Sequence, residues 1–475
     1  MKGQLFINGE WTGDYIETMD VFDPATGEKV GSIPKAGEKE TKLAIDAAHD
    51  AFKDWSLLPA QDRASYLMKW HDLILENKDE IAEILTKEMG KPLAEAKGEI
   101  AYSASFIAWY AEEAKRIYGR TIPASAPNKR IQIMKQPVGV VASITPWNFP
   151  AAMIARKMAP ALAAGCTFVA KPAELTPFTA IKLFELCEEA GFPKGVVNLV
   201  MGDAPSIGRV MTTSDKVRKL TFTGSTEVGK LLIQQSANKV HNLSLELGGH
   251  APMIVCDDAD LDLAVEGVIA SKFRNAGQTC VCGNRIYVQE GILESFMKKL
   301  EVKVKGLKVG NGLEEGVDIG PLIEKKSYEK VQRHVEDAVA KGANVVIGGN
   351  GVANNDSYFF HPTILTNVTD DMVVMQEETF GPVAPIQTFK TDSEVVAKAN
   401  DTRFGLAAYF FTENYSRGTK IAEGLEYGIV GWNDGVPAVA QAPFGGMKES
   451  GMGREGGMEG IEAFLETKFL SISLK

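Results

Sequence analysis

The sequence predicts an α/β protein with two mostly parallel sheets that carry helices on both faces. From Val138 to about Gly249, short apolar strands alternate with helical stretches: VGVVASIT, TFVAKP, VVNLVMG, KLTFTGS and LSLELGG. A second alternation runs from about Ala251 to Tyr427, with APMIVCD, RIYVQ, VVIGG and FHPTIL as its strands. Ligands of such sheets bind beyond the carboxyl ends of the strands, so functional residues are expected there.

The first third of the chain precedes these alternations and is mainly helical. Short strand-like pieces such as INGEW come first. The spacing of apolar residues then predicts helical stretches over 40–55, 60–88 and 97–118. Pro123 and Pro127 end this helical part.

Two stretches far apart in the chain, 130–135 and 470–474, alternate apolar and polar residues as half-buried strands do. These strands could pair into an arm, formed by 121–137 with 462–475, that covers another subunit. A hairpin packed on its own domain explains the pattern equally well. The arm predicts a homo-oligomer, either a dimer or a tetramer.

The composition describes a globular protein with little affinity for polyanions. Hydrophobic residues make up 45% and charged residues 24% of the 475 residues, and the formal net charge is -11. Nucleic acid and anionic membranes need clustered cations, so neither is an expected partner. No uninterrupted apolar run reaches membrane-spanning length, and the N-terminus lacks the apolar core of a secretory signal.

The cysteine and histidine content points to a cytoplasmic protein without a metal. The 5 cysteines are odd in number and scattered, which favours a reducing compartment over a disulfide framework. The 6 histidines fall at no metal-ligand spacing.

The thiol of Cys280 is the first candidate for chemistry. It lies in FRNAGQTCVCGNR, a glycine-bearing loop between a predicted helix over 261–274 and a predicted strand at 286–288. A thiol held between rigid elements is a candidate nucleophile. A lone cysteine is more often a small buried hydrophobe, so the nucleophile depends on motifs elsewhere in the chain.

Six short motifs follow one another at the predicted strand ends: PWNFP (146–150), KPAE (171–174), FTGSTEVG (222–229), LELGG (245–249), GQTC (277–280) and EETFGP (377–382). Together they resemble the aldehyde dehydrogenase superfamily over nearly the whole chain. The resemblance implies the aldehyde dehydrogenase fold. A Rossmann-like NAD(P)-binding domain would comprise 1–120 and 138–249, an α/β catalytic domain 250–430, and the β arm would be the small oligomerisation element.

The chemistry of this family requires a nucleophile, a base and an oxyanion donor. A thiolate adds to the aldehyde, the thiohemiacetal expels hydride to a nicotinamide, and the remaining thioester is hydrolysed. The resemblance assigns the nucleophile to Cys280, the water-activating base to Glu246, and the oxyanion donors to the Asn148 amide and the Cys280 N–H. Burial is expected to raise the pKa of Glu246 toward neutrality. Taken alone, Glu246 is a capping or surface carboxylate and Asn148 a turn residue.

The expected cofactor site differs from the GxGxxG fingerprint. Gly224, Ser225 and Gly229 lie at a strand-to-helix turn, where free N–H groups and the helix dipole suit a pyrophosphate. The resemblance adds further cofactor contacts: Lys171 and Glu174 at the adenosine ribose, Glu378 at the nicotinamide ribose, and Trp147 and Leu247.

The carboxylate of Glu174 bears on the choice of cofactor. It would accept hydrogen bonds from a 2′-hydroxyl and repel a 2′-phosphate. NAD is therefore the expected cofactor, with NADP as the alternative.

Two arginines resemble those of the succinate-semialdehyde dehydrogenase branch. Arg156 follows Asn148 in PWNFPAAMIARK, and Arg274 precedes Cys280 in SKFRNAGQTC. In that branch such arginines hold the distal carboxylate of the substrate through charge-assisted bonds. The alternative is a pair of structural salt bridges. The expected reaction is the oxidation of succinate semialdehyde to succinate.

One departure from the branch leaves the substrate open. Some members carry a serine shortly before PFGG, where this chain has Ala438, Val439 and Ala440. Another short carboxylated aldehyde, such as glutarate semialdehyde, is therefore the alternative substrate. A thiol hydrolase that uses Cys280 and Glu246 without redox chemistry, and a non-catalytic protein on this fold, are more distant alternatives.

Cys282 provides a third likeness to that branch. Two cysteines separated by one residue on a loop can approach disulfide geometry. A reversible bond between Cys280 and Cys282, which would switch the nucleophile off, is therefore a hypothesis.

Overall fold

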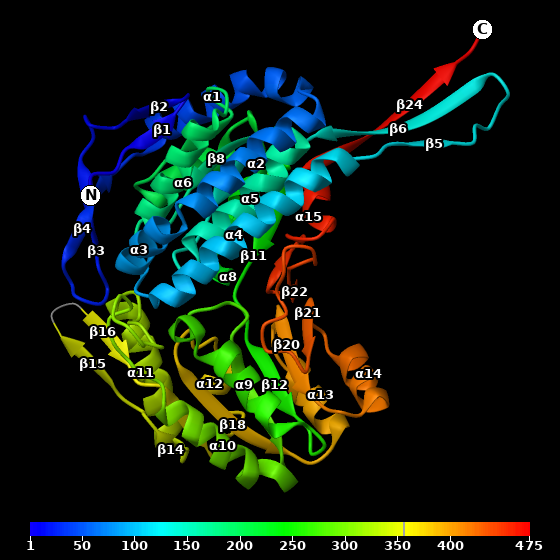
Figure 1. Cartoon of the computed structure of the whole chain (residues 1–475). Helices are drawn as coiled ribbons and strands as arrows, with labels where there is room; N and C mark the ends of the chain where they lie inside the picture. Colours follow the sequence, from blue (N-terminus) through cyan, green and yellow to red (C-terminus); the bar gives the residue numbers. More distant parts are fainter. Residues whose placement is uncertain (355–356) are drawn as a thin grey trace.

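The computed structural model describes residues 1–354 and 357–475, which form two α/β bodies and a projecting arm (Figure 1). The first body is built on an eight-stranded sheet and the second on a seven-stranded sheet. Each body has its own buried apolar side chains. The predicted α/β fold class is confirmed.

The sheet of the first body brings four strand ends to one edge. Its strands, in spatial order, are β2 (Glu10–Thr12), β1 (Leu5–Ile7), β9 (Val197–Leu199), β8 (Thr167–Lys171), β7 (Val140–Ile144), β10 (Val217–Thr223), β11 (Asn242–Glu246) and β23 (Gly451–Met452). The strands from β9 to β11 run parallel. Ile144 pairs with both Lys171 and Phe222, and Thr223 pairs with Glu246, so the carboxyl ends of β8, β7, β10 and β11 finish together.

Helices cover this sheet and bury one another. They are α1 (Glu38–Leu57), α2 (Ala60–Glu76), α3 (Lys78–Met89), α4 (Leu93–Glu113), α5 (Pro150–Ala164), α6 (Pro177–Ala190), α7 (Ala204–Thr213), α8 (Thr226–Ser236) and α15 (Glu459–Glu462). Every residue of α5 is buried, because α2 and α4 pack over it. The predicted continuous helical stretch over 60–88 is wrong at Asn77, where α2 ends and α3 begins. Both the backbone N–H and the side-chain amide of Asn77 donate to the Leu73 carbonyl, which closes the last turn of α2.

The second body places the cysteine loop between a helix and a strand. Its strands, in spatial order, are β14 (Asn344–Ile347), β17 (Thr363–Thr366), β18 (Val383–Phe389), β13 (Gly283–Gln289), β12 (Ala251–Val255), β20 (Ala407–Phe411) and β21 (Ile429–Trp432). Its helices are α9 (Leu261–Lys272), α10 (Leu293–Lys305), α11 (Lys325–Ala340), α12 (Val373–Gln376), α13 (Asp392–Asn400) and α14 (Tyr415–Gly424). Helix α9 leads toward Cys280 and β13 follows it, so the predicted helix, loop and strand are present.

The arm is a three-stranded antiparallel sheet that projects away from both bodies (Figure 1). Strand β24 (Leu465–Ser473) pairs along its length with β6 (Lys129–Pro137), and β5 (Arg120–Ile122) pairs with the other edge of β6. The two alternating stretches of the sequence therefore pair with each other. The projection favours an arm over a hairpin packed on its own domain.

Short antiparallel strand pairs complete the described part of the chain: β3 (Thr18–Phe22) with β4 (Lys29–Pro34), β15 (Gly351–Asn354) with β16 (Ser357–Phe360), and β19 (Phe404–Gly405) with β22 (Met447–Lys448). Across residues 1–354 and 357–475, none of the helices combines the length and the apolar character needed to cross a membrane.

Candidate active site

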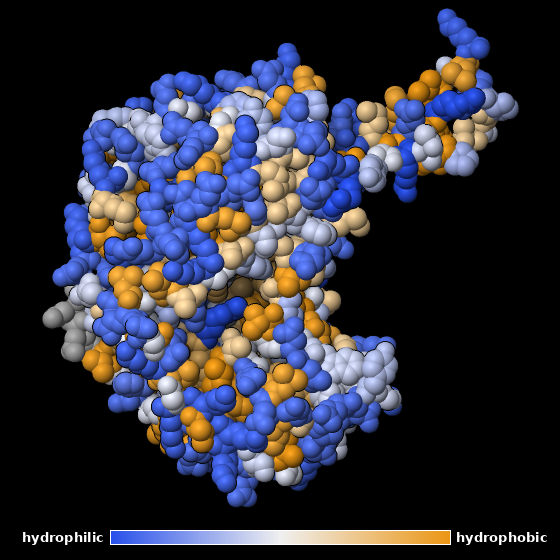
Figure 2. All heavy atoms as spheres, viewed as in Figure 1, coloured by the Kyte–Doolittle hydropathy of each residue, from blue (hydrophilic) through white to orange (hydrophobic). Residues whose placement is uncertain are grey.

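Two cavities meet at Cys280, which lines both. One has a volume of about 230 Å³ and lies between the strand ends of the first sheet and residues of the second body. The other has a volume of about 300 Å³ and lies among α4, α5 and the cysteine loop. The molecular surface is hollowed where the two bodies meet (Figure 2). A thiol at such a junction can face a different molecule on each side.

The smaller cavity collects most of the predicted cofactor contacts. Trp147, Gly224, Ser225, Leu247 and Glu378 line it, together with the predicted oxyanion donor and nucleophile. These residues come from five segments of the chain that meet at the edge of the first sheet. A cavity of mixed polar and aromatic lining, reached from an α/β sheet edge, fits a dinucleotide.

The glycines of the strand-to-helix turn provide space rather than hydrogen-bond donors. The N–H of Gly224 donates to the Glu246 carbonyl at the end of β11, and that of Gly229 donates to the Ser225 carbonyl, so these two glycine N–H groups are not free. A Cβ on Gly224 would lie 2.4 Å from the Phe222 ring, and one on Gly229 would lie 2.5 Å from Leu247. Ser225 caps α8 with its hydroxyl, which keeps the positive end of the helix dipole at the cavity.

The two residues predicted at the adenosine ribose lie outside both cavity linings. Lys171 and Glu174 form an ion pair just beyond β8, with Lys171 buried and Glu174 partly exposed. Their contact with a ribose stays a prediction. Glu378, by contrast, faces the smaller cavity, and the Gly249 N–H donates to its carboxylate at 2.9 Å. Burial raises the pKa of Glu378 to about 7.

Sequence reasoning missed Ser327, Lys330 and Phe380, which also line the smaller cavity. The first two lie on α11, which reads as an ordinary amphipathic surface helix, so no local signal marks them. Phe380 lies inside the EETFGP motif and adopts a left-handed φ of 57°, an unusual conformation for an aromatic residue. Its ring meets Trp147 edge-on, at 5.6 Å between centroids.

The loop before the nucleophile is strained and tightly held. Asn275 and Ala276 both have a φ of 52°, in the left-handed region that non-glycine residues rarely adopt. The Asn275 N–H donates to Glu95 at 2.8 Å, and the Gln278 side chain bonds to the backbone around Pro321. These contacts offset the strain and fix the backbone that carries Cys280.

The thiol of Cys280 is half-buried, and its surroundings hold it in the neutral form. Desolvation raises its pKa to about 12, while the Arg156 guanidinium acts in the opposite direction. The thiolate is the reactive species, so a proton acceptor or a bound cation must promote ionisation before attack. This environment suits a nucleophile that is activated after ligands bind.

The side-chain amide of Asn148 has one hydrogen bond to the loop before Cys280. Its Nδ2 donates to the Gln278 carbonyl at 3.1 Å, while its Oδ1 has no partner in the described part of the chain. A primary amide carries two N–H donors, so the second remains available to a bound oxygen. Asn148 lines the same cavity as Cys280, which fits the predicted role.

Glu246 is buried at the end of β11 and lines neither cavity. Its Oε1 faces Gly445, where an added Cβ would lie 2.8 Å away. Burial raises the pKa of Glu246 well above its usual value, and the Glu455 carboxylate raises it further. The pKa of Glu246 is therefore raised, as expected. Its role as a base stays a prediction, and this role requires the side chain to turn toward Cys280.

The larger cavity contains both predicted arginines in different states. Arg156 is buried, pairs with Glu455 and stacks at 4.2 Å over the Phe444 ring, as the salt-bridge alternative expects. Arg274 lines the cavity with an Nε that has no partner among residues 1–354 and 357–475. Ala438 also lines it, so the position of the missing serine does belong to this cavity. Arg274 is the freer cation.

Tyr102 and Glu95 are further polar groups of the larger cavity that sequence reasoning missed. The Tyr102 hydroxyl lies within hydrogen-bond reach of Arg156 and close to Arg274. Burial raises the pKa of Glu95 to about 6. Both lie on one face of α4 with Glu99, at helical spacing. Polar residues repeating on an otherwise apolar face were the available signal.

Cys282 is fully buried and lines neither cavity. Its Sγ lies 3.3 Å from the Lys272 Nζ, and both Cys280 and Cys282 are free thiols. A bond between them would require the loop to turn Cys282 away from Lys272. The disulfide stays a hypothesis.

Comparisons with known proteins identify the family of this chain. The model of the aldehyde dehydrogenase family matches residues 11–470. The chain is 56% identical to glutarate-semialdehyde dehydrogenase of Pseudomonas putida and to succinate-semialdehyde dehydrogenase GabD, designated NADP(+), of Escherichia coli, in each case over 100% of this chain and 98% of the relative. The crystal structure of an aldehyde dehydrogenase from Brucella melitensis biovar abortus superposes with a TM-score of 0.98 at 56% identity, covering 100% and 98% of the two chains. The chain belongs to the aldehyde dehydrogenase family.

Proposed function

We propose that this enzyme oxidises a short aldehyde that carries a distal carboxylate, with succinate semialdehyde as the preferred substrate and NAD(P) as the hydride acceptor. The free guanidinium of Arg274 carries the proposal, because it lies in the cavity on the far side of Cys280 from the cofactor site. A guanidinium that lines a cavity can form charge-assisted, often bidentate, bonds with a carboxylate ligand. Relatives named for succinate and glutarate semialdehydes support an anionic aldehyde.

The residues at the cavity junction take distinct roles in the proposed reaction. The Cys280 thiolate attacks the aldehyde carbon, and the Asn148 amide donates to the oxygen that becomes negative. NAD(P), bound in the smaller cavity, supplies the acceptor for the hydride that leaves this carbon. Glu246 then removes a proton from the water that hydrolyses the thioester on Cys280.

Tyr102 takes the place of the serine found in some members of the branch. Its hydroxyl stands beside Arg156 and Arg274 in the same cavity as Ala438. A hydroxyl can donate to a carboxylate, so Tyr102 can supply the third contact that Ala438 cannot make. Glutarate semialdehyde remains the alternative substrate, because it has only one more methylene group between the aldehyde and the carboxylate than succinate semialdehyde has.

We propose NAD as the preferred cofactor and NADP as the alternative. The Glu174 carboxylate stands just beyond β8, where a 2′-phosphate would be repelled. The Lys171 partner weakens this repulsion, since it neutralises part of the charge. Initial rates with NAD and with NADP at the same aldehyde concentration decide between the two.

Replacing Arg274 by alanine tests the substrate. We expect kcat/KM for succinate semialdehyde to fall about 10- to 100-fold, because a hydrogen bond to a charged group contributes about 1.5–3 kcal/mol. The value for butanal, which lacks a carboxylate, should stay within about twofold. Reduced nicotinamide absorbance measures both, with glutarate semialdehyde as a third substrate.

Arg209→Ala is the matched control, since Arg209 is an exposed arginine on α7 that lines neither cavity. It should leave all three substrates unchanged. Equal losses for succinate semialdehyde and butanal in Arg274→Ala would refute the carboxylate site but leave the dehydrogenase. A higher kcat/KM for glutarate semialdehyde than for succinate semialdehyde would favour the alternative substrate.

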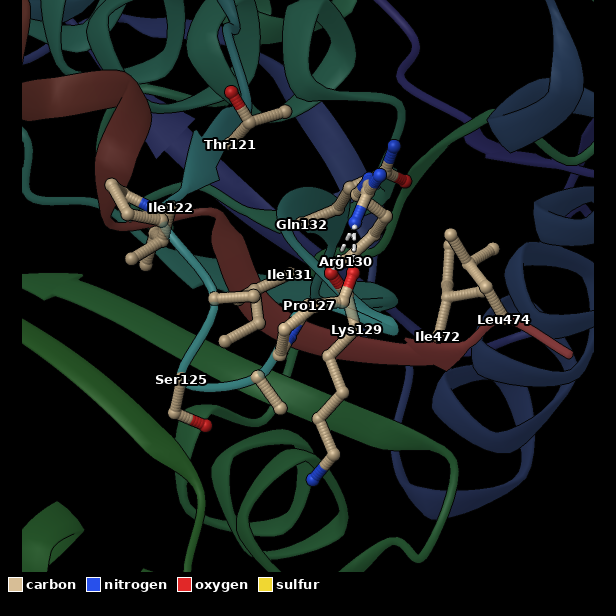
Figure 3. A pocket seen from close by; sticks show the side chains of 13 residues that line it. Thr121, Ile122, Ser125, Pro127, Lys129, Arg130, Ile131, Gln132, Ile472 and Leu474 are labelled. Atoms are coloured by element: carbon tan, nitrogen blue, oxygen red, sulfur yellow. Dashed lines mark hydrogen bonds between the residues drawn. The ribbon is translucent and has the colours of Figure 1, made fainter.

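We further propose that the arm joins copies of this chain into a homo-oligomer. The arm carries a concave surface with a volume of about 670 Å³, lined by apolar side chains that include Ile122, Ile131, Ile472 and Leu474 (Figure 3). Phe469 is 61% exposed on the same arm, and Figure 2 shows further hydrophobic side chains there. Apolar groups gathered on a projecting sheet indicate an interface.

Phe469→Asp should shift the assembly toward smaller species, because a charge buried in an apolar interface is costly. Analytical ultracentrifugation of the wild type and the variant measures the shift. Val302→Asp, the same kind of change at an exposed apolar residue of α10 outside the arm, is the control. A wild type that sediments as a monomer at every concentration would rule out the arm as an interface.

We place the enzyme in the cytoplasm. All five cysteines are free thiols, which suits a reducing compartment.

A further inference from the structure

A buried ion pair lies directly behind the candidate oxyanion donor. Lys91, in the short link between α3 and α4, places its Nζ 2.5 Å from the Glu99 carboxylate on α4, and both side chains are 1% exposed. Burying two charges is costly, and an apolar pair of similar size is often equally stable. A role for the pair is therefore sought in the groups to which Lys91 and Glu99 are hydrogen-bonded.

Glu99 caps helix α5 from outside. Its Oε1 accepts hydrogen bonds from the N–H groups of Ala151 and Ala152, at 2.9 and 3.2 Å. The first N–H groups of a helix have no partner within it, and the N-cap residue Phe149 has no side-chain acceptor to offer. Glu99 thereby fixes the start of α5, two residues after Asn148.

Lys91 fixes the backbone of Asn148 itself. Its Nζ donates to the Asn148 carbonyl at 2.7 Å and lies 3.8 Å from the centre of the Phe149 ring. The side chain of Asn275, from the strained loop before Cys280, donates to the same carbonyl at 3.1 Å. One carbonyl oxygen thus joins the ion pair, the candidate oxyanion donor and the nucleophile loop.

We propose that Lys91 and Glu99 are positioning residues, which hold the Asn148 amide where the oxyanion forms. The pair fixes the residue on both sides: Lys91 at its carbonyl and Glu99 at the helix that follows. The hydrogen bond from Asn148 Nδ2 to the Gln278 carbonyl then sets the rotation of the amide. This inference rests on the proposed oxyanion role of Asn148.

The same pair also bears on α5, which carries Arg156 two turns further on. A pair that acted mainly through Arg156 would alter the KM of carboxylated aldehydes. A pair that acts through Asn148 alters the rate of thiohemiacetal formation and hydride loss with every aldehyde. The two effects are therefore separable.

The experiment is a double-mutant cycle between Glu99→Gln and Asn148→Ala. Glutamine keeps the shape of Glu99 and an acceptor for the helix N–H groups, but leaves Lys91 without its counter-charge. We expect Glu99→Gln to lower kcat for both succinate semialdehyde and butanal about 10- to 100-fold, since small misplacements of catalytic groups have effects of this size. In the Asn148→Ala background the same change should have an effect below about twofold, because the group it positions is gone.

Lys91→Arg provides a second variant, which keeps the charge but alters the contact with the Asn148 carbonyl. Glu113→Gln is the matched control, since Glu113 is a buried carboxylate on α4 that pairs with Arg116 at 2.9 Å, away from the cavities. It should leave kcat unchanged. Circular dichroism and thermal melting establish that each variant is folded, and Lys91→Arg replaces Glu99→Gln in the cycle should the latter not fold.

Each outcome decides a separate point. Equal losses from Glu99→Gln in the wild-type and Asn148→Ala backgrounds would show a merely structural role and overturn the inference. A normal kcat in Glu99→Gln and in Lys91→Arg would do the same. A normal kcat in Asn148→Ala would instead remove the oxyanion role on which the inference depends, while strong coupling in the cycle would support both.

Discussion

Cys280→Ala is expected to abolish aldehyde-dependent reduction of NAD(P). Removing a catalytic nucleophile lowers kcat by about 10⁴-fold or more, because no other group can form the covalent intermediate from which hydride leaves. The variant should still bind cofactor, since Cys280 is one of many residues that line the smaller cavity. Stopped-flow absorbance should show neither a burst nor a steady rate of reduced nicotinamide, and fluorescence titration should show cofactor binding.

Cys256→Ala is the matched control for this prediction. Cys256 is also a free thiol, but it is buried at the end of β12, away from both cavities. Its removal should leave kcat within about twofold, as expected for a small change outside the site. Normal activity in Cys280→Ala would remove the nucleophile assignment.

Normal peroxide sensitivity in Cys282→Ala would separately count against the disulfide hypothesis.

The sequence predicts the sheet edge well because the chemistry-bearing motifs follow strands whose ends are set by local patterns. Ile144, Thr223 and Glu246 end three apolar runs, and the parallel register brings these ends together. Parallel strands buried on both faces give continuous apolar runs, which are easily found in a sequence. The strand pattern alone therefore suffices to place Trp147, Asn148 and Ser225 near one another.

Features that depend on distant contacts could not be predicted in this way. Arg156 pairs with Glu455, and Lys157 pairs with the same carboxylate, although almost 300 residues separate them in the chain. No spacing rule links such positions, so one of the two candidate substrate arginines turned out to have an internal partner. Lys330 of the cofactor cavity escaped notice for the same reason, because α11 reaches the site only through the packing of the second body.

A sequence pattern also does not predict the direction in which a side chain points. The LELGG motif predicts a buried Glu246, and Glu246 is 1% exposed. The pattern does not say that the carboxylate turns toward Gly445. This orientation depends on the loop before β22, which approaches β11 only in the folded chain. Glu246 lines neither cavity, so the proposed base role requires its side chain to turn toward the thioester before hydrolysis.

Glu246→Gln is expected to stop the enzyme after one turnover. Attack by Cys280 and hydride loss do not need the proposed base for water, so reduced nicotinamide should appear in a burst of one equivalent per site. Thioester hydrolysis should then slow about 10²- to 10⁴-fold, the usual contribution of a general base. Stopped-flow absorbance measures the burst, and mass spectrometry of the quenched protein should find the acyl group on Cys280.

The pH dependence gives an independent test of the same residue. Burial raises the pKa of Glu246 well above its usual value, so a larger fraction is protonated near neutral pH than for an exposed carboxylate. A base acts when ionised, and the rate of thioester hydrolysis in the wild type should therefore rise with pH until this carboxyl has lost its proton. The rise should be absent in Glu246→Gln and unchanged in Glu113→Gln, whose buried carboxylate lies away from the cavities. A Glu246→Gln enzyme that turns over steadily, or that keeps the wild-type pH profile of hydrolysis, would assign the base to another group.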